Sequence, residues 1–323
     1  MKKYVGCDLG GTNLKAAVVD PLTGELSGVT SVPTLAREGH EAVLARMAQL
    51  IDTVIAASGV DRSEIGGVGI GAPGTMDMER GMSLFMPNLI GNWIEVPITG
   101  VISNAVHLPT FLINDVRAMT VGEWKLGAGR GIDTVACLAL GTGIGGGLII
   151  GGKLHLGIGG SAGELGHQTI NFDGPPCGCG NHGCLETYAS GPAITAVGLK
   201  YITQGQATRI ATLVDYDLNK VNPKVIAQAA KEGDPIAIDI YERAGYYLGI
   251  AVANILVAVS PQRVVIGGGV AEAGDLLLEP VRRTVKERVF VVPVDQIDIV
   301  PAALGVNAGI IGAGLWAQIQ TQA

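Results

Sequence analysis

Three cysteines lie close together in one short segment, PPCGCGNHGCLE, which runs from Pro175 to Glu186. Cys177, Cys179 and Cys184 have the spacing C-x-C-x4-C, and the glycines between them allow a tight loop whose thiolates turn inward. Structural zinc sites bind the ion through four such ligands in a tetrahedron. The segment therefore predicts a structural Zn²⁺ site, and the alternative is three unligated cysteines.

A fourth metal ligand is needed, and two histidines are near enough in the sequence to supply it. His167 ends the segment AGELGH, whereas His182 lies inside the cysteine loop. We favour His167, because His182 sits between two ligands in a loop that already turns sharply. The predicted ligand set is His167, Cys177, Cys179 and Cys184.

Two turns rich in glycine and threonine have the composition of phosphate-binding turns. DLGGTN places Asp8 at the end of an apolar run, just before amides and a hydroxyl that can receive phosphate oxygens, with Lys15 beyond. LGTGIGGG, from Leu140, is the matching turn in the second half of the chain. Either could be an ordinary hairpin turn, but two such turns facing across a cleft would hold a nucleotide's terminal phosphates. The residues assigned to the nucleotide here are Asp8, Gly10, Gly11, Thr12, Asn13, Lys15, Gly141, Thr142 and Gly143.

A third glycine cluster, IGGGV from Ile266, follows an apolar strand and precedes a helix. Gly268 and Gly269 would let the backbone approach an adenosine closely. The alternative is a plain strand-to-helix turn.

Carboxylates stand beside these motifs. Asp115 follows Asn114 at the end of the apolar strand TFLIN, which is the strand end where open α/β sheets place their ligands. An Asp before a helix is also a routine N-cap, and taken alone that interpretation is favoured. Glu164 and Glu186 flank the cysteine loop. Held rigidly there, they would suit recognition of vicinal hydroxyls, although either could be a solvated surface charge.

The elements that must position these residues alternate between strands and helices. YVGCDLGGTNLKAAVV and TVACLALGTGIGGGLII both read as strand, tight turn and strand, and sliding one onto the other superposes Cys7 on Cys137 and Thr12 on Thr142. This is a distant internal repeat. Apolar periodicity predicts helices over 41–58 and 234–259, and further strands are expected at 65–71, 110–114, 263–267 and 297–300. The class is therefore α/β.

Composition and charge exclude several classes of protein. The 323 residues are 48% hydrophobic and only 16% charged, which is too apolar for a disordered chain, and the length suggests two domains. Because 22 basic residues face 29 acidic ones, the net charge of -7 offers no broad basic surface to nucleic acid. The sequence has no run of 18 apolar residues that would span a membrane and no signal peptide at its start. We expect a cytoplasmic protein, and its uneven cysteine count fits a reducing compartment.

Taken together, DLGGTN, GAPG, Asn114-Asp115, LGTGIGGG, ELGH, CGCGNHGCLE and IGGG resemble the ROK family (repressors, open reading frames and kinases) in order and spacing. The match looks close to the bacterial ATP-dependent glucokinases of this family. The resemblance implies two actin-like ATPase (ribonuclease H-like) domains around a nucleotide cleft, and a repeat of the kind seen here is what such a fold leaves in a sequence. We expect a smaller domain of residues 1–116 plus the C-terminal helix, about 309–323, and a larger one of 117–308 that carries the zinc loop.

The resemblance also implies roles for single residues. Asp115 would be the general base that takes the proton of the sugar's 6-hydroxyl, and Asp8 would help to hold Mg²⁺ through water. His167 would ligate zinc with one ring nitrogen and meet a sugar hydroxyl with the other. The sugar-binding set is Gly74, Asn88, Asn114, Asp115, Glu164, His167 and Glu186.

Function is thus expected to be phosphorylation of glucose at the 6-hydroxyl by ATP. The alternatives are a kinase for mannose, fructose, allose or N-acetylmannosamine, and a sugar-sensing protein without catalysis, since the family includes repressors. Those repressors add a DNA-binding region before the sugar domain, for which the seven residues before Asp8 leave no room. A homodimer or homotetramer is expected from the resemblance alone.

Overall fold

The two segments of the predicted repeat both form antiparallel hairpins. In the first, β1 (Lys3–Leu9) pairs with β2 (Asn13–Val19), and Leu9 lies opposite Leu14. In the second, β8 (Val135–Leu140) pairs with β9 (Ile144–Ile150), and Leu140 lies opposite Ile144. The strand, turn and strand predicted for each segment are confirmed.

The structure of the protein is a computed structural model that describes residues 2–86 and 89–322. Asn88, predicted in a sugar-site loop, lies outside the described residues.

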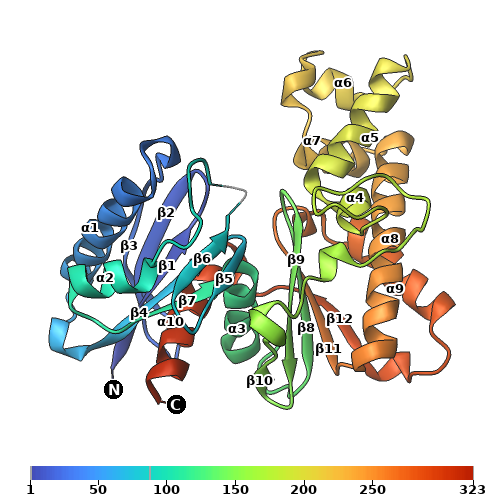
Figure 1. The fold of residues 1–323 in the computed structure, drawn as a ribbon. Helices are drawn as coiled ribbons and strands as arrows, with labels where there is room; N and C mark the ends of the chain where they lie inside the picture. The colour runs from blue at the N-terminus through green and yellow to red at the C-terminus, as the bar shows by residue number, and fades with distance from the viewer. Residues whose placement is uncertain (1, 87–88, 323) are drawn as a thin grey trace. The chain divides into compact units, whose positions relative to one another are not determined.

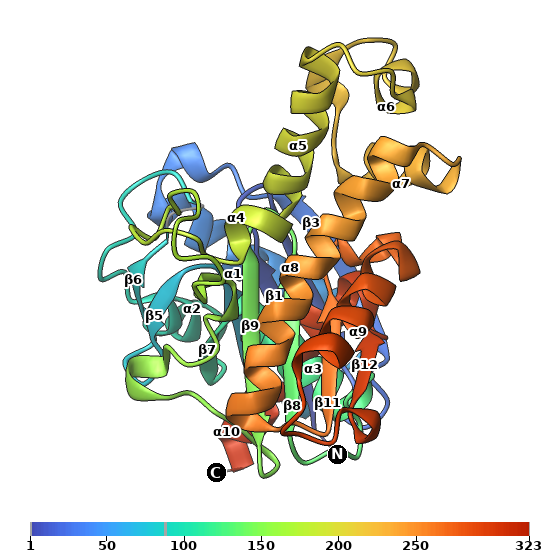
Figure 2. The same cartoon turned by 90° about the vertical axis from the view of Figure 1, so that its right-hand side faces the viewer.

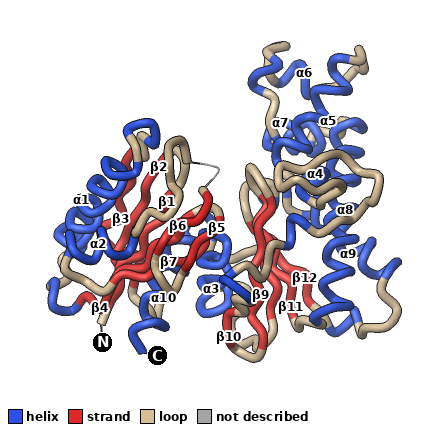
Figure 3. The backbone as a smooth tube through the Cα atoms, in the orientation of Figure 1, coloured by secondary structure: helices blue, strands red, loops and turns tan. Residues whose placement is uncertain are grey.

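The chain divides into two compact units. The first, unit 1, contains residues 1–131, 154–162 and 303–323, and the second, unit 2, contains residues 132–153 and 163–302. Each unit is built on one five-stranded sheet, shown in red in Figure 3. The strand orders are β3-β2-β1-β4-β7 and β10-β9-β8-β11-β12, and in both sheets the hairpin is followed by two parallel strands. The α/β class is therefore confirmed.

Unit 1 has helices on both faces of its sheet (Figure 1). The first face carries α1 and α2, and the second carries α3 and α10. A short β5–β6 hairpin follows β4. The remaining elements are β3 (Leu26–Pro33), α1 (His40–Ser58), β4 (Ile65–Ala72), β5 (Thr75–Asp77), β6 (Met82–Phe85), α2 (Ile98–Val106), β7 (Thr110–Asn114), α3 (Asp115–Leu126) and α10 (Ala308–Gln322).

The C-terminal helix α10 belongs to unit 1 because glycines let it approach the sheet and α3 at backbone distance. A Cβ at Gly69 in β4 would lie 1.8 Å from the carbonyl oxygen of Ala313, and one at Gly312 would lie 1.6 Å from that of Ala118. No side chain larger than hydrogen fits at either position. These contacts agree with the expectation that the C-terminal helix returns to the first domain.

Unit 2 covers one face of its sheet with the long helices α8 and α9, and α5, α6 and α7 lie beyond the sheet along α8 (Figure 2). Asp234 caps α8, and its carboxylate accepts the N–H groups of Ile236 and Ala237. The remaining elements are β10 (Lys153–Leu154), α4 (Glu186–Ala189), α5 (Gly191–Thr203), α6 (Arg209–Leu213), α7 (Pro223–Lys231), α8 (Pro235–Val259), β11 (Arg263–Gly267), α9 (Asp275–Arg288) and β12 (Asp298–Pro301).

The limits of the units differ from the domain limits expected at residues 116 and 309. Helix α3 lies in unit 1, because it packs on α10, and it carries two buried charged residues that hold backbone of the same unit. The guanidinium of Arg117 donates two hydrogen bonds to the carbonyl oxygen of Ala162. The carboxylate of Glu123 accepts the N–H groups of Ala128, Ala303 and Leu304 at 2.8 to 3.0 Å. These contacts draw residues 127–131, 154–162 and 303–308 into unit 1.

The predicted helices and strands occur with ends shifted by at most one residue: α1 begins at His40, α8 begins at Pro235, and β12 runs from Asp298 to Pro301. Among the described residues, no helix combines the length and the apolar character needed to cross a membrane.

Candidate functional site

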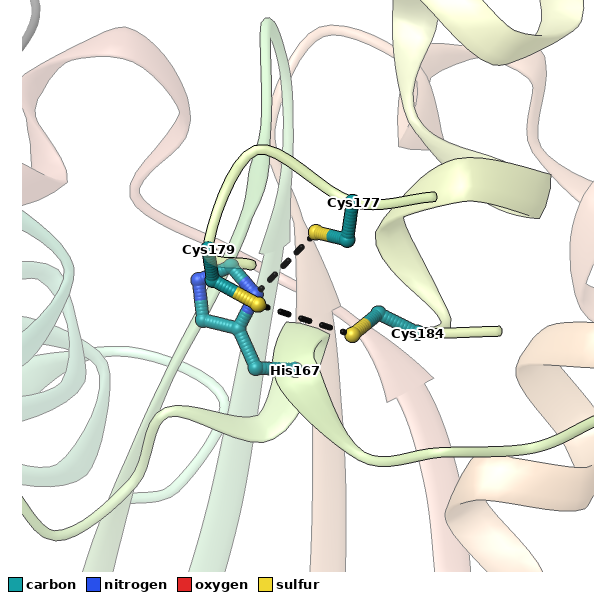
Figure 4. Close-up of side chains that lie close together, drawn as sticks. All are labelled: His167, Cys177, Cys179 and Cys184. Atoms are coloured by element: carbon teal, nitrogen blue, oxygen red, sulfur yellow. Dashed lines mark hydrogen bonds between the residues drawn. The ribbon is translucent and has the colours of Figure 1, made fainter. Parts of the chain in front are cut away.

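The four predicted metal ligands come together in unit 2. One ligand atom from each of His167, Cys177, Cys179 and Cys184 lies within 4.8 Å of the others. Figure 4 shows the three sulfurs and the imidazole directed toward a common point, with Nδ1 of His167 3.7 Å from Sγ of Cys177. His182 is exposed and is not part of the cluster. The structure thus brings His167, rather than His182, to the sulfurs.

The loop folds around this cluster through its own backbone. The N–H of Cys177 donates to the carbonyl of Asn181 at 2.8 Å, and Cys184 pairs with Thr169 in an isolated bridge. Cys184 is fully buried. Burial, together with the neighbouring Cys179 and Cys177, raises the pKa of the Cys184 thiol to about 12. A Cys₃His donor set at this spacing fits Zn²⁺, which displaces the proton of a coordinating thiol.

Glu186 connects the cysteine loop to the second glycine turn. It is the first residue of α4, two positions after Cys184, and Oε2 of its carboxylate accepts the N–H of Ile144 at 2.9 Å. Oε1 lies 3.8 Å from Sγ of Cys177. Glu186 is therefore a partly buried residue whose carboxylate is oriented by its bond to the turn.

The ELGH segment packs directly against β9, with the backbone of one in contact with the backbone of the other. A Cβ at Gly166 would lie 1.9 Å from the carbonyl oxygen of Ile144, and one at Gly146 would lie 2.6 Å from that of Gly163. The glycine run 145–147 therefore serves the approach of this segment to β9, and only residues 141–143 form the turn itself. Glu164 is exposed and His167 is partly buried at the end of this segment.

A pocket of about 670 Å³ opens beside the second turn, within the usual size range for a small-molecule or cofactor site. Three of the residues predicted to contact a nucleotide line it: Gly141, Thr142 and Gly269. Gly268, which precedes Gly269, is not among the lining residues. Its walls are mainly small and apolar. They come from α5 between its first residue and Leu199, from the start of α7 with its cap, and from the loop after β11: Gly191, Pro192, Thr195, Ala196, Leu199, Asn222, Pro223, Lys224 and Val270.

Sequence reasoning missed these walls, and little in the sequence marks them. The Pro residues at the second position of α5 and the first of α7 only indicate helix starts. Asn222 caps α7, and its side-chain oxygen accepts the N–H groups of Lys224 and Val225. The tertiary fold of unit 2 is what places these helix starts beside the glycine turn.

The first turn, in unit 1, differs because it has charges of its own. Asp8 and Lys15 lie opposite each other in the β1–β2 ladder, on either side of residues 10–12. Burial raises the pKa of Asp8, and the charge of Lys15 opposes this effect in part. Gly11, Thr12 and Asn13 are exposed, so their backbone is open to a ligand. A carboxylate and an ammonium thus flank this turn.

Asn114, and not Asp115, is the N-cap of α3. Its side-chain oxygen accepts the N–H groups of Val116 and Arg117, and its amide nitrogen donates to the carbonyl oxygen of Gly74. Asp115 is the first residue of the helix and is partly buried, and Oδ1 of its carboxylate accepts the N–H of Val116 at 2.8 Å. The N-cap interpretation of Asp115 is therefore wrong, since the preceding residue makes the cap.

The predicted site residues are divided between the units, each described by itself. Unit 1 holds Gly74, Asn114, Asp115 and the turn from Asp8 to Lys15, and unit 2 holds Glu164, His167, Glu186, the cysteines and the glycines at 141, 143, 268 and 269. Within unit 2 the metal cluster, Glu186, the second turn and the pocket form one continuous set of contacts.

Comparison with known proteins places these features in a family. The model of the ROK family matches residues 4–320. A glucokinase of Thermotoga maritima is 37% identical, over 96% of this chain and 96% of its own length. A xylose repressor of Caldicellulosiruptor bescii is 32% identical, over 95% of this chain and 76% of its own length.

The solved structures give the same result for the fold. A ROK family glucokinase from Streptomyces griseus, determined in complex with glucose and AMPPNP, has 34% sequence identity and a TM-score of 0.82. The match covers 98% of this chain and 99% of that one.

Proposed function

The chain belongs to the ROK family, and we propose that it is an ATP-dependent glucokinase, which transfers the γ-phosphoryl group of ATP to the 6-hydroxyl of glucose. The observation that carries this proposal is the similarity to glucokinases over nearly the full length of both chains, including one that binds glucose and AMPPNP. The geometry of each unit supports it, as follows.

The pocket beside the second turn in unit 2 would hold the ATP molecule. Its apolar walls, such as Pro192, Leu199 and Val270, suit an adenine ring, and the turn 141–143 with Gly268 and Gly269 offers backbone N–H groups to phosphate oxygens. The turn from Gly10 to Asn13 in unit 1 would take the terminal phosphates. Asp8 would help to hold Mg²⁺ through water, and this ion neutralises charge on the phosphoryl oxygens.

Asp115 is the proposed general base. Phosphoryl transfer requires mainly alignment and charge stabilisation, so a carboxylate within hydrogen-bond reach of the attacking hydroxyl is sufficient. Its place as the first residue of α3, directly after the cap made by Asn114, fixes its backbone. It accepts the proton of the 6-hydroxyl as that oxygen attacks the γ-phosphorus.

Each unit holds residues that are proposed to bind sugar hydroxyls. Unit 1 contributes Asn114, whose amide has a second N–H, and the loop at Gly74. Unit 2 contributes Glu164, His167 and Glu186; Asn88 completes the proposed set. Carboxylates accept hydrogen bonds from vicinal hydroxyls, so these positions would discriminate glucose from its epimers.

The metal cluster would support sugar recognition without taking part in the reaction. His167, Cys177, Cys179 and Cys184 supply the donor types and the number of ligands that structural zinc requires. A zinc ion on one ring nitrogen of His167 would fix the tautomer of the other, which would meet a sugar hydroxyl. Metal analysis of protein purified without chelator should give about one zinc per chain, and a value near zero would contradict this assignment.

A steady-state assay tests the proposed activity. ADP release is measured with glucose, mannose, fructose, allose and N-acetylmannosamine, with a sugar-free reaction as control, and the product is identified with glucose-6-phosphate dehydrogenase. We expect the highest kcat/KM with glucose and a 6-phosphate product.

The alternatives give different results in the same assay. Preference for another of these sugars would keep the kinase and change its substrate. Binding of glucose without ADP release above the sugar-free control would instead favour a sugar-sensing protein, which the similarity to a xylose repressor makes the second candidate.

A further inference from the structure

The peptide of Ile144 is a junction between three parts of unit 2. Ile144 ends the second glycine turn and begins β9, and it is 3% exposed. Its N–H donates to Oε2 of Glu186 at 2.9 Å, and its carbonyl oxygen lies against Gly166 of the ELGH segment. The turn, Glu186 and the segment that carries Glu164 and His167 therefore meet at one backbone unit.

The chain that follows the cysteine loop holds the turn at both ends. Glu186 binds the end at Ile144, and the N–H of Gly191 donates to the carbonyl oxygen of Gly141 at 2.8 Å. A Cβ at Gly191 would lie 3.0 Å from that same oxygen, so the approach is close. Six residues, from Glu186 at the start of α4 to Gly191 at the start of α5, thus span the turn and fix its width.

The Glu186 carboxylate also lies in the space that a side chain at residue 143 would occupy. A Cβ at Gly143 would lie 2.4 Å from Oε2 of Glu186, whereas a Cβ at Gly141 would have nothing within 4 Å. The φ angle of Gly143 is not among the positive values. A side chain at position 143 would therefore displace the Glu186 carboxylate, whereas the backbone conformation there does not require glycine.

We propose that Glu186 is a positioning residue for the nucleotide: its bond to the Ile144 N–H holds the turn 141–143 in the shape that receives phosphate, before any sugar binds. This inference rests on the proposed function, which assigns Glu186 to the sugar. It adds that the same carboxylate sets nucleotide affinity through Oε2, the oxygen that accepts the Ile144 N–H.

Nucleotide binding in the absence of sugar tests the inference. The Kd for AMPPNP with Mg²⁺ is measured by calorimetry for the wild type, Glu186→Ala and Glu186→Gln. The alanine variant leaves a backbone donor without its partner, so we expect Kd to rise about tenfold. The glutamine variant retains an amide oxygen that can accept the Ile144 N–H, so its Kd should stay within about threefold of the wild type. This rescue separates hydrogen bonding from simple loss of packing.

A double-mutant cycle tests the same contact from the other side. Gly143→Ala pushes the carboxylate away from Ile144, so it should weaken AMPPNP binding in the wild type and add little in Glu186→Ala. Gly141→Ala is the matched control, because its methyl group meets nothing and its effect should be equal in both backgrounds. Circular dichroism verifies that each variant is folded.

The outcomes separate this inference from the proposed function. Equal AMPPNP affinity in the wild type and Glu186→Ala, or additive effects of Gly143→Ala and Glu186→Ala, would overturn the positioning role even if the wild type phosphorylates glucose. A wild type that binds AMPPNP and shows the predicted coupling, but releases no ADP with any sugar, would overturn the kinase activity and support the positioning role. A wild type that does not bind AMPPNP would overturn both.

Discussion

The two glycine turns occupy the same place in two sheets of the same strand order. They differ in which residues place a charge beside the turn and in which residues hydrogen-bond to its backbone. The turn between β1 and β2 lies between Asp8 and Lys15, which face each other across the hairpin. The turn between β8 and β9 lies between Leu140 and Ile144 and has no charge of its own. Its carboxylate comes from Glu186, 42 residues further along the chain.

The supports differ in the same way. Thr34, which follows β3, holds both ends of the first turn: its hydroxyl donates to the carbonyl oxygen of Gly10 at 2.6 Å, and its N–H donates to that of Thr12 at 2.8 Å. The second turn is held by Glu186 and Gly191, on either side of α4. The comparison teaches that the same kind of turn can be fixed by the residue after a neighbouring strand or by the chain that follows the cysteine loop. Under the proposed function, only the second arrangement would link nucleotide binding to that loop.

Among the changes at the first turn, Asp8→Asn should have the largest effect on turnover, because it removes the one acidic charge of that turn. If Asp8 helps to hold Mg²⁺, kcat should fall by about 10²-fold, the size of effect seen when one electrostatic group is lost from an active site. A Mg²⁺ titration of kcat measures this. Asp20→Asn, near the other end of the hairpin, is the matched control and should keep its activity. Wild-type turnover and Mg²⁺ dependence in Asp8→Asn would contradict the role.

The same variant, although less active, should be more stable than the wild type at neutral pH. Because burial raises the pKa of Asp8 in the folded state, the folded protein binds this proton more tightly than the unfolded chain does. The wild type therefore loses stability as pH rises through the folded pKa. Asp8→Asn should be more stable than the wild type at pH 7, and the difference should vanish below about pH 3.9, the pKa of an unperturbed Asp. Urea unfolding at pH 3 to 8 measures the difference; a variant less stable than the wild type at pH 7 would refute the burial argument.

Thr34→Val should give the smallest effect of the three. It keeps the size of a fully buried side chain but removes the hydroxyl that binds Gly10, at a cost of about 1 to 2 kcal/mol. Hydrogen exchange of the amides from Gly10 to Asn13 should become faster, whereas Thr34→Ser, which retains the hydroxyl, should stay near the wild type. No change in exchange for the valine variant would show that the strand does not support the turn.

Much of the fold could be predicted because its signals are local. The hairpins follow from β-branched runs around glycine turns, and α1 and α8 follow from apolar periodicity. The family and its α/β fold, two actin-like ATPase domains, were predicted from the motifs and are shown by the comparisons. The exact domain limits were not predictable, because the place of α3 depends on its contact with α10 at Gly122 and Gly312, nearly two hundred residues apart.

The site was predictable only where residue types are distinctive. The cysteine loop and the choice of His167 follow from ligand spacing, and the four side chains do meet. The pocket walls at Pro192 and Asn222 consist of ordinary residues that the tertiary fold brings together. The bond between Glu186 and Ile144 joins distant positions and has no local signal. The roles of the site residues and the homodimer or homotetramer stay predictions.

The most direct test of the central claim compares Asp115→Asn with the wild type in two measurements made on the same preparation. The asparagine can still accept the N–H of Val116 but cannot take a proton, so kcat for glucose should fall by about 10² to 10⁴, while the Kd for glucose stays within about threefold. Asp61→Asn, at the N-cap of a short helical turn outside the site motifs, is the control and should leave both values unchanged. Wild-type turnover in Asp115→Asn, or a loss of glucose affinity as large as the loss of turnover, would contradict the assignment of Asp115 as the base.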